Sequence, residues 1–368
     1  DINELPVGDK TLSSKEIIGN ESQERMGMIV NDKDIETVRE IAERERAPFY
    51  VVGKTTDDHR FVFRQNDGVK PIDLAMSDMF GSSPKTYMVD KTVKREPKSF
   101  KYSAAELNEY VTNVLQLEAV ACKDWLTNKV DRSVTGKIAR QQCQGEIQLP
   151  LSDCGVVSLD YTGTKGIATS IGHAPQIALI DPEQGSVSAI AESLTNIVTA
   201  PLADGIKSVS LSANWMWPCR NEGEDAALYS AVKACSDFAV GLGINIPTGK
   251  DSLSMTQKYG DKKVVSPGTV IISAGAEVKD VKKTVSPVVQ AKDSSIYYVD
   301  FSNDELKLGG SALSQVLNKV GSDVPTVKSS EYFAKAFEAV QKLVSKKKLL
   351  AMHDISAGGM ITALLEMV

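Results

Sequence analysis

The sequence predicts a protein of mixed α/β and α+β architecture that is divided into more than one domain. A chain of 368 residues exceeds the usual size of a single hydrophobic core. Strand and helix patterns alternate along it, and polar, proline-containing stretches at 83–100 and 281–292 have the composition of domain boundaries. We therefore expect parts at 1–82, 101–282 and 283–368, with 83–100 as a linker.

The first part, residues 1–82, has the pattern of a β-α-β-β unit. Its apolar runs are short, and an acidic helix start precedes the amphipathic stretch. The expected elements are a strand at Met26–Val30, a helix starting near Asp32 or Asp34 and stopped by Pro48, and strands at Phe49–Val52 and Arg60–Phe63. This is too little for a whole α/β layer, so we expect the end of a domain that begins upstream.

The middle part, residues 101–282, combines strands and helices in the manner of an α+β domain. The expected helices are Ser103–Leu117, Ser186–Thr199 and Glu224–Leu242. The expected strands are Glu146–Leu151, Val156–Leu159, Ile167–Ile171, Ile177–Ile180, Val209–Ser212 and Thr269–Ala274.

The last part, residues 283–368, is expected to open a second α/β domain. Its expected elements are strands at Ile296–Asp300 and Leu349–Met352 and helices at Ser311–Val320 and Glu331–Ser345. The chain starts at Asp1 and stops inside the apolar helical run Met360–Val368, which carries no glycine or asparagine stop signal. We expect it to be a piece of a longer polypeptide.

Composition narrows the classes of function. The net charge of −6 gives no broad footprint for nucleic acid, and the short cluster Lys346–Lys348 is typical of a solvated helix end. Five cysteines without C-x-x-C spacing argue against a disulfide framework or a zinc site and favour a reducing, cytoplasmic location. Three histidines argue against a His-rich metal site. No apolar run has the length of a membrane span, so we expect no membrane partner.

The most informative motif is the stretch Leu349–Met360. An apolar strand is expected to run into Asp354, and a small turn with Gly358 and Gly359 then leads into a helix. Free backbone N–H groups at such a turn can bind an anion, and the carboxylate can hold Mg²⁺ against a nucleotide phosphate. The alternative is that the glycines only permit a tight turn. We interpret His353 as structural.

Weaker signals come from three other places. Glu192 and Asn196 are four residues apart on the polar face of an expected helix, so their oxygens can converge on Mg²⁺, unless they form only a solvated face. Asp153 follows an apolar strand, where an aspartate is most often a turn residue. Lys123 lies in an amphipathic segment and is by itself an ordinary surface lysine.

Two further segments attract notice without defining a site. Thr248–Ser252 has a Gly-Lys pair, but Asp251 follows the lysine and Gly243 is one residue too far away, so we reject a P-loop. Asn20–Arg25 places six polar residues before an expected strand, which a solvated edge would explain.

Six segments, taken in order, resemble one family. They are Asn20-Glu-Ser-Gln-Glu-Arg25, Ala42-Glu-Arg-Glu-Arg-Ala-Pro48, Leu211-Ser-Ala-Asn-Trp-Met216, Gly223-Glu-Asp-Ala-Ala-Leu-Tyr229, Gly249-Lys-Asp-Ser-Leu-Ser-Met255 and His353-Asp354. They are similar to the large, single-chain type of phosphoribosylformylglycinamidine synthase. The resemblance implies the aminoimidazole ribonucleotide synthetase-like fold, with an N-type α+β domain at 101–282 flanked by partial C-type α/β domains.

The resemblance also implies a function. Enzymes of this family use ATP and glutamine to convert formylglycinamide ribonucleotide to formylglycinamidine ribonucleotide. Their second half carries an auxiliary Mg²⁺–nucleotide site. Carried over by position, the Mg²⁺ ligands would be Asp153, Glu192, Asn196 and Asp354, and the nucleotide contacts would be Lys123, Ser152 and Ser356.

The glutaminase domain and the first N-type domain are expected elsewhere in the same polypeptide, so we expect no catalytic residue here and no turnover by this piece alone. Two alternatives stay open. The chain could be a structural module that nucleotide only stabilises, or a sister-fold ATP-dependent kinase or synthetase.

Overall fold

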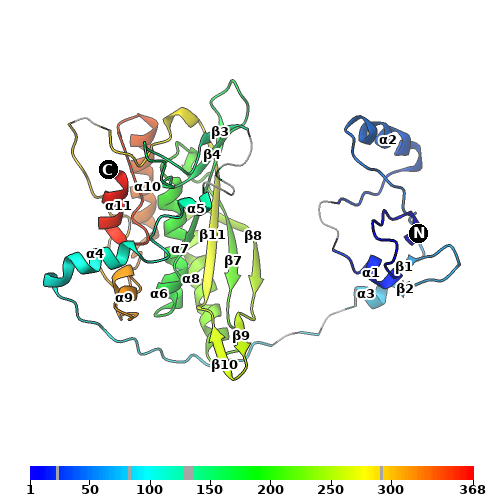
Figure 1. Ribbon diagram of the computed structural model, residues 1–368, viewed down its shortest axis with the longest axis horizontal. Helices are drawn as coiled ribbons and strands as arrows, with labels where there is room; N and C mark the ends of the chain where they lie inside the picture. The colour runs from blue at the N-terminus through cyan, green and yellow to red at the C-terminus, as the bar shows by residue number, and fades with distance from the viewer. Residues whose placement is uncertain (22–24, 82–83, 86, 128–131, 133–135, 291–292) are drawn as a thin grey trace. The chain divides into compact units, whose positions relative to one another are not determined.

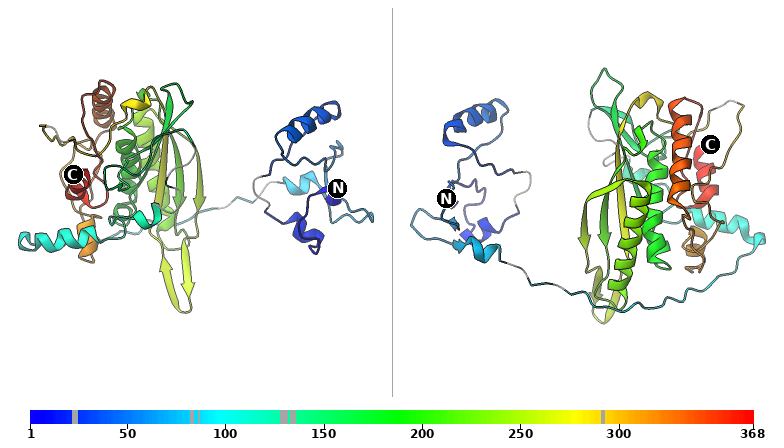
Figure 2. Two further views of the ribbon diagram at one scale, coloured as in Figure 1. Left: turned by 45° about the horizontal axis from the view of Figure 1, so that its top comes forward. Right: turned by 180° about the vertical axis from the view of Figure 1, so that it is seen from behind.

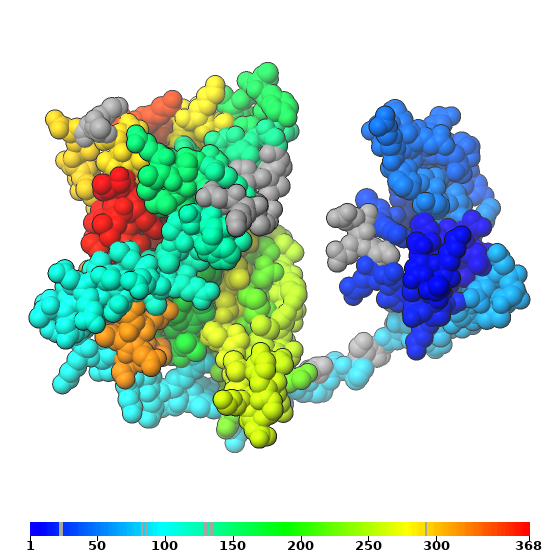
Figure 3. Space-filling view, viewed as in Figure 1, coloured from blue at the N-terminus to red at the C-terminus, as the bar shows by residue number. Residues whose placement is uncertain are grey.

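The computed structural model describes residues 1–21, 25–81, 84–85, 87–127, 132, 136–290 and 293–368. The chain forms two compact units, Asp1–Tyr87 and Met88–Val368, which we describe separately (Figures 1 and 3). Residues 22–24, in the middle of the Asn20–Arg25 segment, lie outside the described residues. None of the described helices is long and apolar enough to cross a membrane.

The first unit holds one antiparallel hairpin and short helices. Strand β1 pairs with β2 from Arg60↔Ala75 to Phe63↔Ile72. The elements of this unit are η1 (Ile2–Glu4), α1 (Ser14–Ile18), η2 (Asp32–Asp34), α2 (Ile35–Arg44), β1 (Arg60–Phe63), β2 (Ile72–Ala75) and α3 (Met76–Met79). The expected helix before Pro48 and the expected strand at Arg60–Phe63 are thereby confirmed.

Two strands expected in the first unit are wrong. Neither Met26–Val30 nor Phe49–Val52 forms a strand with any described part of the chain. Met26 is 90% exposed and Val51 is 41% exposed. An apolar run becomes a strand only when a neighbouring strand pairs with its backbone, and the hairpin offers no partner to either segment.

The second unit is built on a six-stranded sheet with the order β3-β4-β5-β11-β7-β8 (Figures 1 and 2). The long central strand β11 pairs antiparallel with both β5 and β7, whereas β8 runs parallel to β7. The strands are β3 (Ile138–Arg140), β4 (Gly155–Ser158), β5 (Gly166–His173), β7 (Ser210–Met216), β8 (Asn245–Ser252) and β11 (Thr269–Val278).

Helices cover one face of this sheet and leave the other exposed. The side chains of β5 alternate, with Ala168 fully buried and Ile171 57% exposed. Helix α7 (Pro182–Ile197) packs on β5 and β11, and α8 (Glu224–Leu242) packs beside α7. The side chain of Asp181 caps α7 by accepting hydrogen bonds from the backbone N–H groups of Glu183 and Gln184.

Helix α10 (Ser330–Ser345) shares the core of the sheet and its helices. Its Phe333 and Phe337 are fully buried, and they belong to the same apolar cluster as Leu194 and Ile272. The buried side chain of Gln341 adds polar contacts, because its Nε2 donates to the carbonyl oxygens of Val198 and Ala200, each at 2.8 Å. Residues after 283 are therefore bound tightly to the α+β layers.

Smaller elements complete the second unit. They are η3 (Ala104–Glu106), α4 (Leu107–Leu115), α5 (Asp124–Thr127), α6 (Pro175–Ala178), β6 (Ala203–Ile206), the hairpin β9 (Thr256–Tyr259) and β10 (Lys262–Val265), η4 (Val281–Lys283), α9 (Ala312–Val316) and α11 (Gly359–Met367). The expected helices of this unit are confirmed, although α9 is shorter than Ser311–Val320.

Four expected strands of the second unit are wrong. Ile177–Ile180 overlaps α6, because Pro175 occupies the first helical turn. Glu146–Leu151 forms turns joined by one bridge between Gln144 and Leu149. Ile296–Asp300 and Leu349–Met352 pair with no strand among the residues that the structure describes, and Tyr297 is 83% exposed. The sequence pattern had given no sign of β8 or of the β9–β10 hairpin.

Candidate functional site

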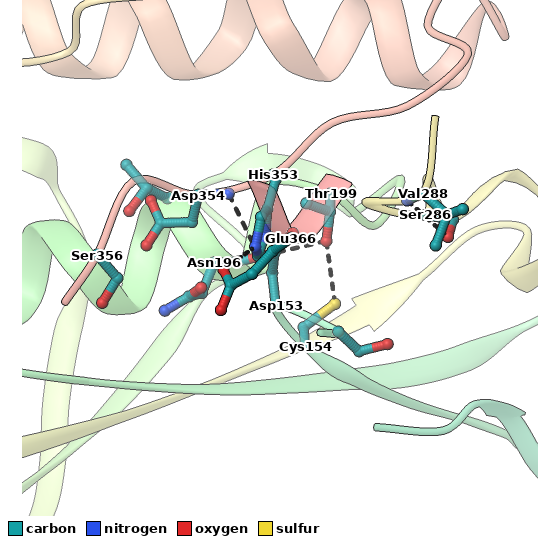
Figure 4. Close-up of polar contacts among 12 residues, drawn as sticks. Asp153, Cys154, Asn196, Thr199, Ser286, Val288, His353, Asp354, Ser356 and Glu366 are labelled. Atoms are coloured by element: carbon teal, nitrogen blue, oxygen red, sulfur yellow. Dashed lines mark hydrogen bonds and ion pairs between the residues drawn. The ribbon is translucent and has the colours of Figure 1, made fainter. Parts of the chain in front are cut away.

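A polar cavity of about 630 Å³ lies where the sheet, α7 and the C-terminal segment meet (Figure 4). Five parts of the chain line it: the turn that enters β4, strand β5, the last turns of α7, the middle of β11, and the stretch from His353 into α11. We call it the acidic pocket. The predicted site residues among its lining are Ser152, Asp153, Asn196, Asp354 and Ser356.

Buried neighbours hold the two aspartates in place. Asp153 directly precedes the buried Cys154, whose Sγ lies 3.2 Å from Thr199 Oγ1 at the end of α7. Asp354 follows Met352, which packs against the core and donates its backbone N–H to the carbonyl oxygen of Ser286 at 3.1 Å. The positions of both aspartates are thus set by core packing.

A tight turn connects Asp354 to α11. Gly358 has a φ of +94°, and a Cβ at this position would lie 2.3 Å from Thr362 Oγ1. Gly359 has a φ of +73°. Both conformations are strained for residues other than glycine, so these glycines are what allows the chain to turn directly into the helix.

His353 bridges two carboxylates. Its Nδ1 lies 2.6 Å from Asp153 Oδ1, and its Nε2 lies 2.9 Å from Glu366 Oε2 on α11 (Figure 4). Burial alone lowers the pKa of His353, but the hydrogen bonds to the two carboxylates outweigh burial and raise the pKa to about 10. The imidazole is therefore protonated at neutral pH and fixes the orientation of Asp153.

One oxygen on each aspartate has no partner. Asp153 Oδ2 and Asp354 Oδ2 are both buried and accept no hydrogen bond from the residues that the structure describes. Burial raises the pKa of Asp153. Burial, followed by the charge of Asp153, raises the pKa of Asp354 to about 7. Two buried carboxylates with bare oxygens are costly unless a cation or a proton neutralises them.

Helix α7 adds Glu192 and Asn196 on its face toward the pocket. The backbone N–H of His173 donates to Glu192 Oε2 at 2.6 Å, and the hydroxyl of Ser356 donates to Glu192 Oε1. Asn196 donates its amide nitrogen to the carbonyl oxygen of Ile171 at 3.0 Å, which leaves the amide oxygen for a ligand. The hydrogen bond to Ser356 connects Glu192 to the residues that line the pocket.

Of the predicted site residues, Glu192 is absent from the lining but is joined to the pocket by its hydrogen bond to Ser356, whereas Lys123 is not brought to the pocket. It is absent from the lining, and its Nζ donates to the carbonyl oxygen of Ala121 at 3.0 Å. Ser152 does line the pocket, with its hydroxyl donating to the carbonyl oxygen of Gln141 at 2.7 Å.

Sequence reasoning missed two members of the site. We had interpreted His353 only as structural, and Glu366 had not been considered. Glu366 is the only charged residue in the apolar run Met360–Val368. A lone carboxylate on an apolar helix was the signal that pointed to a buried partner.

The donor set suits a hard divalent cation. The pocket gathers carboxylates around one imidazolium, so negative charge is in excess. Carboxylate and amide oxygens are the ligands that Mg²⁺ prefers, and the two bare aspartate oxygens are free to bind it. Within the described residues, however, no three or more His, Cys, Asp or Glu side chains are already gathered as a metal cage. Binding therefore requires side-chain adjustment, such as release of Glu192 from Ser356.

Two family models match the chain. Residues 122–277 match the FGAR-AT PurM_N-like domain, and residues 1–66 match the AIR synthase related protein, C-terminal domain. A C-terminal-type domain thus precedes an N-type domain, as the six sequence segments had implied. Residues 1–66 and 122–277 are therefore similar to two domains of PurL-like synthetases.

Solved structures of PurL from Thermotoga maritima share the fold. The complex of T. maritima PurL with ADP matches with a TM-score of 0.56 at 17% identity, over 78% of this chain and 43% of that one. The T. maritima PurLQS structure matches with a TM-score of 0.55 at 17% identity, over 78% of this chain and 43% of that one. The complex of T. maritima PurL with ATP matches with a TM-score of 0.52 at 16% identity, over 77% of this chain and 42% of that one. The expected aminoimidazole ribonucleotide synthetase-like fold is confirmed. This chain spans less than half the length of these solved structures.

Proposed function

We propose that this region is part of an ATP- and glutamine-dependent ligase that converts formylglycinamide ribonucleotide to formylglycinamidine ribonucleotide in purine biosynthesis. We further propose that the acidic pocket is its auxiliary Mg²⁺–nucleotide site. The observation that carries the second proposal is the pair of buried, unpartnered oxygens on Asp153 and Asp354. T. maritima PurL, which shares the fold, is described in complexes with ATP and with ADP.

In this proposal the metal ligands are Asp153, Glu192, Asn196 and Asp354. Bound Mg²⁺ would neutralise the charge of the nucleotide phosphates and fix their position. Because His353 occupies Asp153 Oδ1, only Asp153 Oδ2 is available to the metal. The histidine is thus a positioning residue that sets which aspartate oxygen faces the ligand.

The nucleotide contacts proposed are Ser152, Ser356 and Lys123. Both serines line the pocket, Ser152 from the turn before β4 and Ser356 from the turn before α11. Helix α11 begins at Gly359, and the N–H groups of its first turn that follow Gly359 would be donors for phosphate oxygens. The N–H of Gly359 itself donates to the carbonyl oxygen of Ser356 at 3.0 Å. Lys123 would reach a phosphate only after its segment moves toward the pocket, since its Nζ is now bonded to Ala121.

We propose that catalysis requires the rest of the same polypeptide. The first N-type domain would supply the catalytic ATP site, and the glutaminase domain would supply ammonia. This region alone is then expected to bind nucleotide without turnover. A cytoplasmic location is supported by the five cysteines, all of which are free.

A second candidate function is that of a structural module stabilised by nucleotide. Asp153 and Asp354 are 201 residues apart in the sequence and meet at the pocket, where the backbone N–H of Asp354 donates to Asp153 Oδ1 at 3.3 Å. A ligand held by both residues would join these segments and stabilise the fold by mass action. In that case the parent's reaction would continue when the site is disabled.

Mg²⁺-dependent binding of ADP tests the site itself. In a thermal-shift titration, a hundredfold excess over Kd should stabilise the unmodified chain by about 2.7 kcal/mol. Glu192→Gln should weaken binding by more than about tenfold, because it removes a charged ligand. Glu183→Gln is the matched control, since Glu183 is exposed in the first turn of the same helix. Equal responses of the two variants would overturn the metal assignment.

Turnover is tested separately. The chain is supplied with ATP, ammonia and formylglycinamide ribonucleotide, and phosphate release is measured beside the full-length parent. We expect the full-length parent to release phosphate and this chain to release none. Phosphate release by this chain at a comparable rate would contradict the proposed division of labour.

A further inference from the structure

A second cavity, of about 380 Å³, lies elsewhere in the same unit. It is bounded by the end of β3, by η4 and the residues after it, and by the segment after α10. It shares no lining residue with the acidic pocket. Four of its lining residues are cations, namely Arg140, Lys282, Lys283 and Lys347. We call it the basic cavity.

The positive charge of the basic cavity is largely uncompensated. Lys283 has one loose ion pair, with Asp280 at 4.0 Å. Arg140, Lys282 and Lys347 form no ion pair within the described part of the chain. The chain as a whole carries a net charge of −6, so this concentration of cations is local. Cations gathered around a cavity attract anions and raise their local concentration.

Two buried polar groups in the wall of the cavity also lack partners. Arg140 donates through Nη1 to Gln144 Oε1 at 2.9 Å and through Nη2 to the carbonyl oxygen of Thr284 at 2.7 Å, but its Nε has no acceptor. Among the described residues, the hydroxyl of Thr284 has no partner either, and Thr284 is only 7% exposed. Unsatisfied buried donors are costly, and an oxyanion would accept from both after small side-chain rotations.

We propose that the basic cavity binds a small oxyanion of the phosphate or phosphate-ester class. A cavity of about 380 Å³ accommodates a phosphate or a pyrophosphate, and the side chains of Leu349 and Leu350 provide an apolar wall for an organic group. The cations surround a recess instead of following an extended groove, which favours a small ligand over a nucleic acid strand.

The position of the cavity gives such a ligand a structural consequence. Lys347 and Leu349 stand at the start of the segment that carries His353 and Asp354 into the acidic pocket. Arg140 ends β3 and contacts Thr284. An anion held by both Arg140 and Lys347 would therefore fasten this segment to the edge of the sheet.

The proposal is tested by calorimetric titration of pyrophosphate into the whole 368-residue chain at constant ionic strength, with EDTA and no Mg²⁺. Without metal, the acidic pocket repels the probe, so failure here is distinct from failure of the nucleotide site. Lys282→Gln combined with Lys347→Gln should weaken binding by about tenfold or more, through loss of two charge-assisted contacts. The matched control is Lys346→Gln with Lys348→Gln, which removes equal charge from lysines outside the lining.

The control variant should bind as the unmodified chain does. Equal weakening in both variants, no binding by the unmodified chain at millimolar pyrophosphate, or displacement of the probe by duplex DNA at equal phosphate would each overturn the proposal.

Thr284→Val provides a second test with two readouts of opposite sign. Replacing an unsatisfied buried hydroxyl with a methyl group of similar size should raise the melting temperature of the anion-free chain. The same change should reduce the upward shift that pyrophosphate produces. A variant whose pyrophosphate-induced shift is unchanged or larger would contradict the role of Thr284 in the site.

Discussion

Replacing Asp354 with asparagine should make the metal-free protein more stable at neutral and alkaline pH while removing its response to Mg²⁺. The side chain is buried, one of its oxygens has no partner, and its pKa is raised to about 7. Asparagine keeps the shape of the side chain and carries no charge. The gain in stability and the loss of metal binding then have the same cause.

The sign and size of the stability difference between the two proteins follow from the pKa of Asp354. The folded chain holds a proton on Asp354 up to about pH 7, whereas the unfolded chain releases it near the ordinary value of 3.8. Stability therefore falls as pH rises through this window and levels off above it. At about 1.36 kcal/mol for each pH unit, the full loss is about 4 kcal/mol. Asp354→Asn should be more stable than the unmodified chain by up to this amount at pH 8, with no advantage near pH 4.

The titration of His353 also lowers the free energy of unfolding as pH rises, and this effect must be separated from that of Asp354. Its pKa is raised to about 10, so its contribution to stability is fully present below pH 6.5 and is lost as pH rises toward 10. Both proteins retain this decline. The difference between them therefore isolates Asp354.

The assay is urea unfolding of both proteins from pH 4.5 to 8.5, with and without Mg²⁺. Below pH 7 the apparent Mg²⁺ affinity of the unmodified chain should rise by about tenfold per pH unit, because the metal competes with one proton. A difference in stability that does not change with pH would refute the argument. So would equal stabilisation of the variant by Mg²⁺.

Three further predictions concern the fold that supports the site, each read from the free energy of unfolding. Phe337→Ala should cost about 3–5 kcal/mol if α10 belongs to the shared core, and a cost below about 1 would place the helix outside it. Gln341→Leu leaves the carbonyl oxygens of Val198 and Ala200 without their donor and should lower the free energy of unfolding by about 1–3 kcal/mol. An unchanged free energy of unfolding would show that these hydrogen bonds do not stabilise the fold. Gly172→Ala puts a Cβ 2.2 Å from a backbone oxygen of α7, so it should lower the free energy of unfolding by about 1–3 kcal/mol and weaken ADP binding. An unchanged free energy of unfolding would contradict the close packing of β5 on α7.

The helices were the most predictable part of the fold. Glu224–Leu242 has the expected bounds because its glycine boundaries and apolar spacing are local signals. Strands depended on partners that the sequence does not reveal. The apolar run Ile296–Asp300 has the composition of a strand, but it has no strand partner in the structure and is largely exposed. Conversely, β8 was missed because its residues, such as Thr248–Ser252, are polar.

The site was predictable residue by residue but not as an arrangement. Glu192 could be selected because the polar face of a helix makes its oxygen atoms available, whereas Asp354 was selected as the end of a strand that the structure does not contain. That Asp153 lies against the His353–Asp354 segment depends on packing between residues 200 positions apart, which no local pattern contains. The same limit explains why the bridge from His353 to Glu366 was missed and why Lys123 was expected at a pocket that it does not reach.

The most direct test of the Mg²⁺–nucleotide site is to locate the metal. Crystals of the chain grown with Mn²⁺ and ADP would be examined for anomalous scattering from manganese. The account predicts one strong peak in the acidic pocket within ligand distance of Asp153 Oδ2 and Asp354 Oδ2, with the nucleotide phosphates beside it and Ser356 released from Glu192. A peak located elsewhere, or ADP bound in the pocket with no metal at these two oxygens, would contradict it.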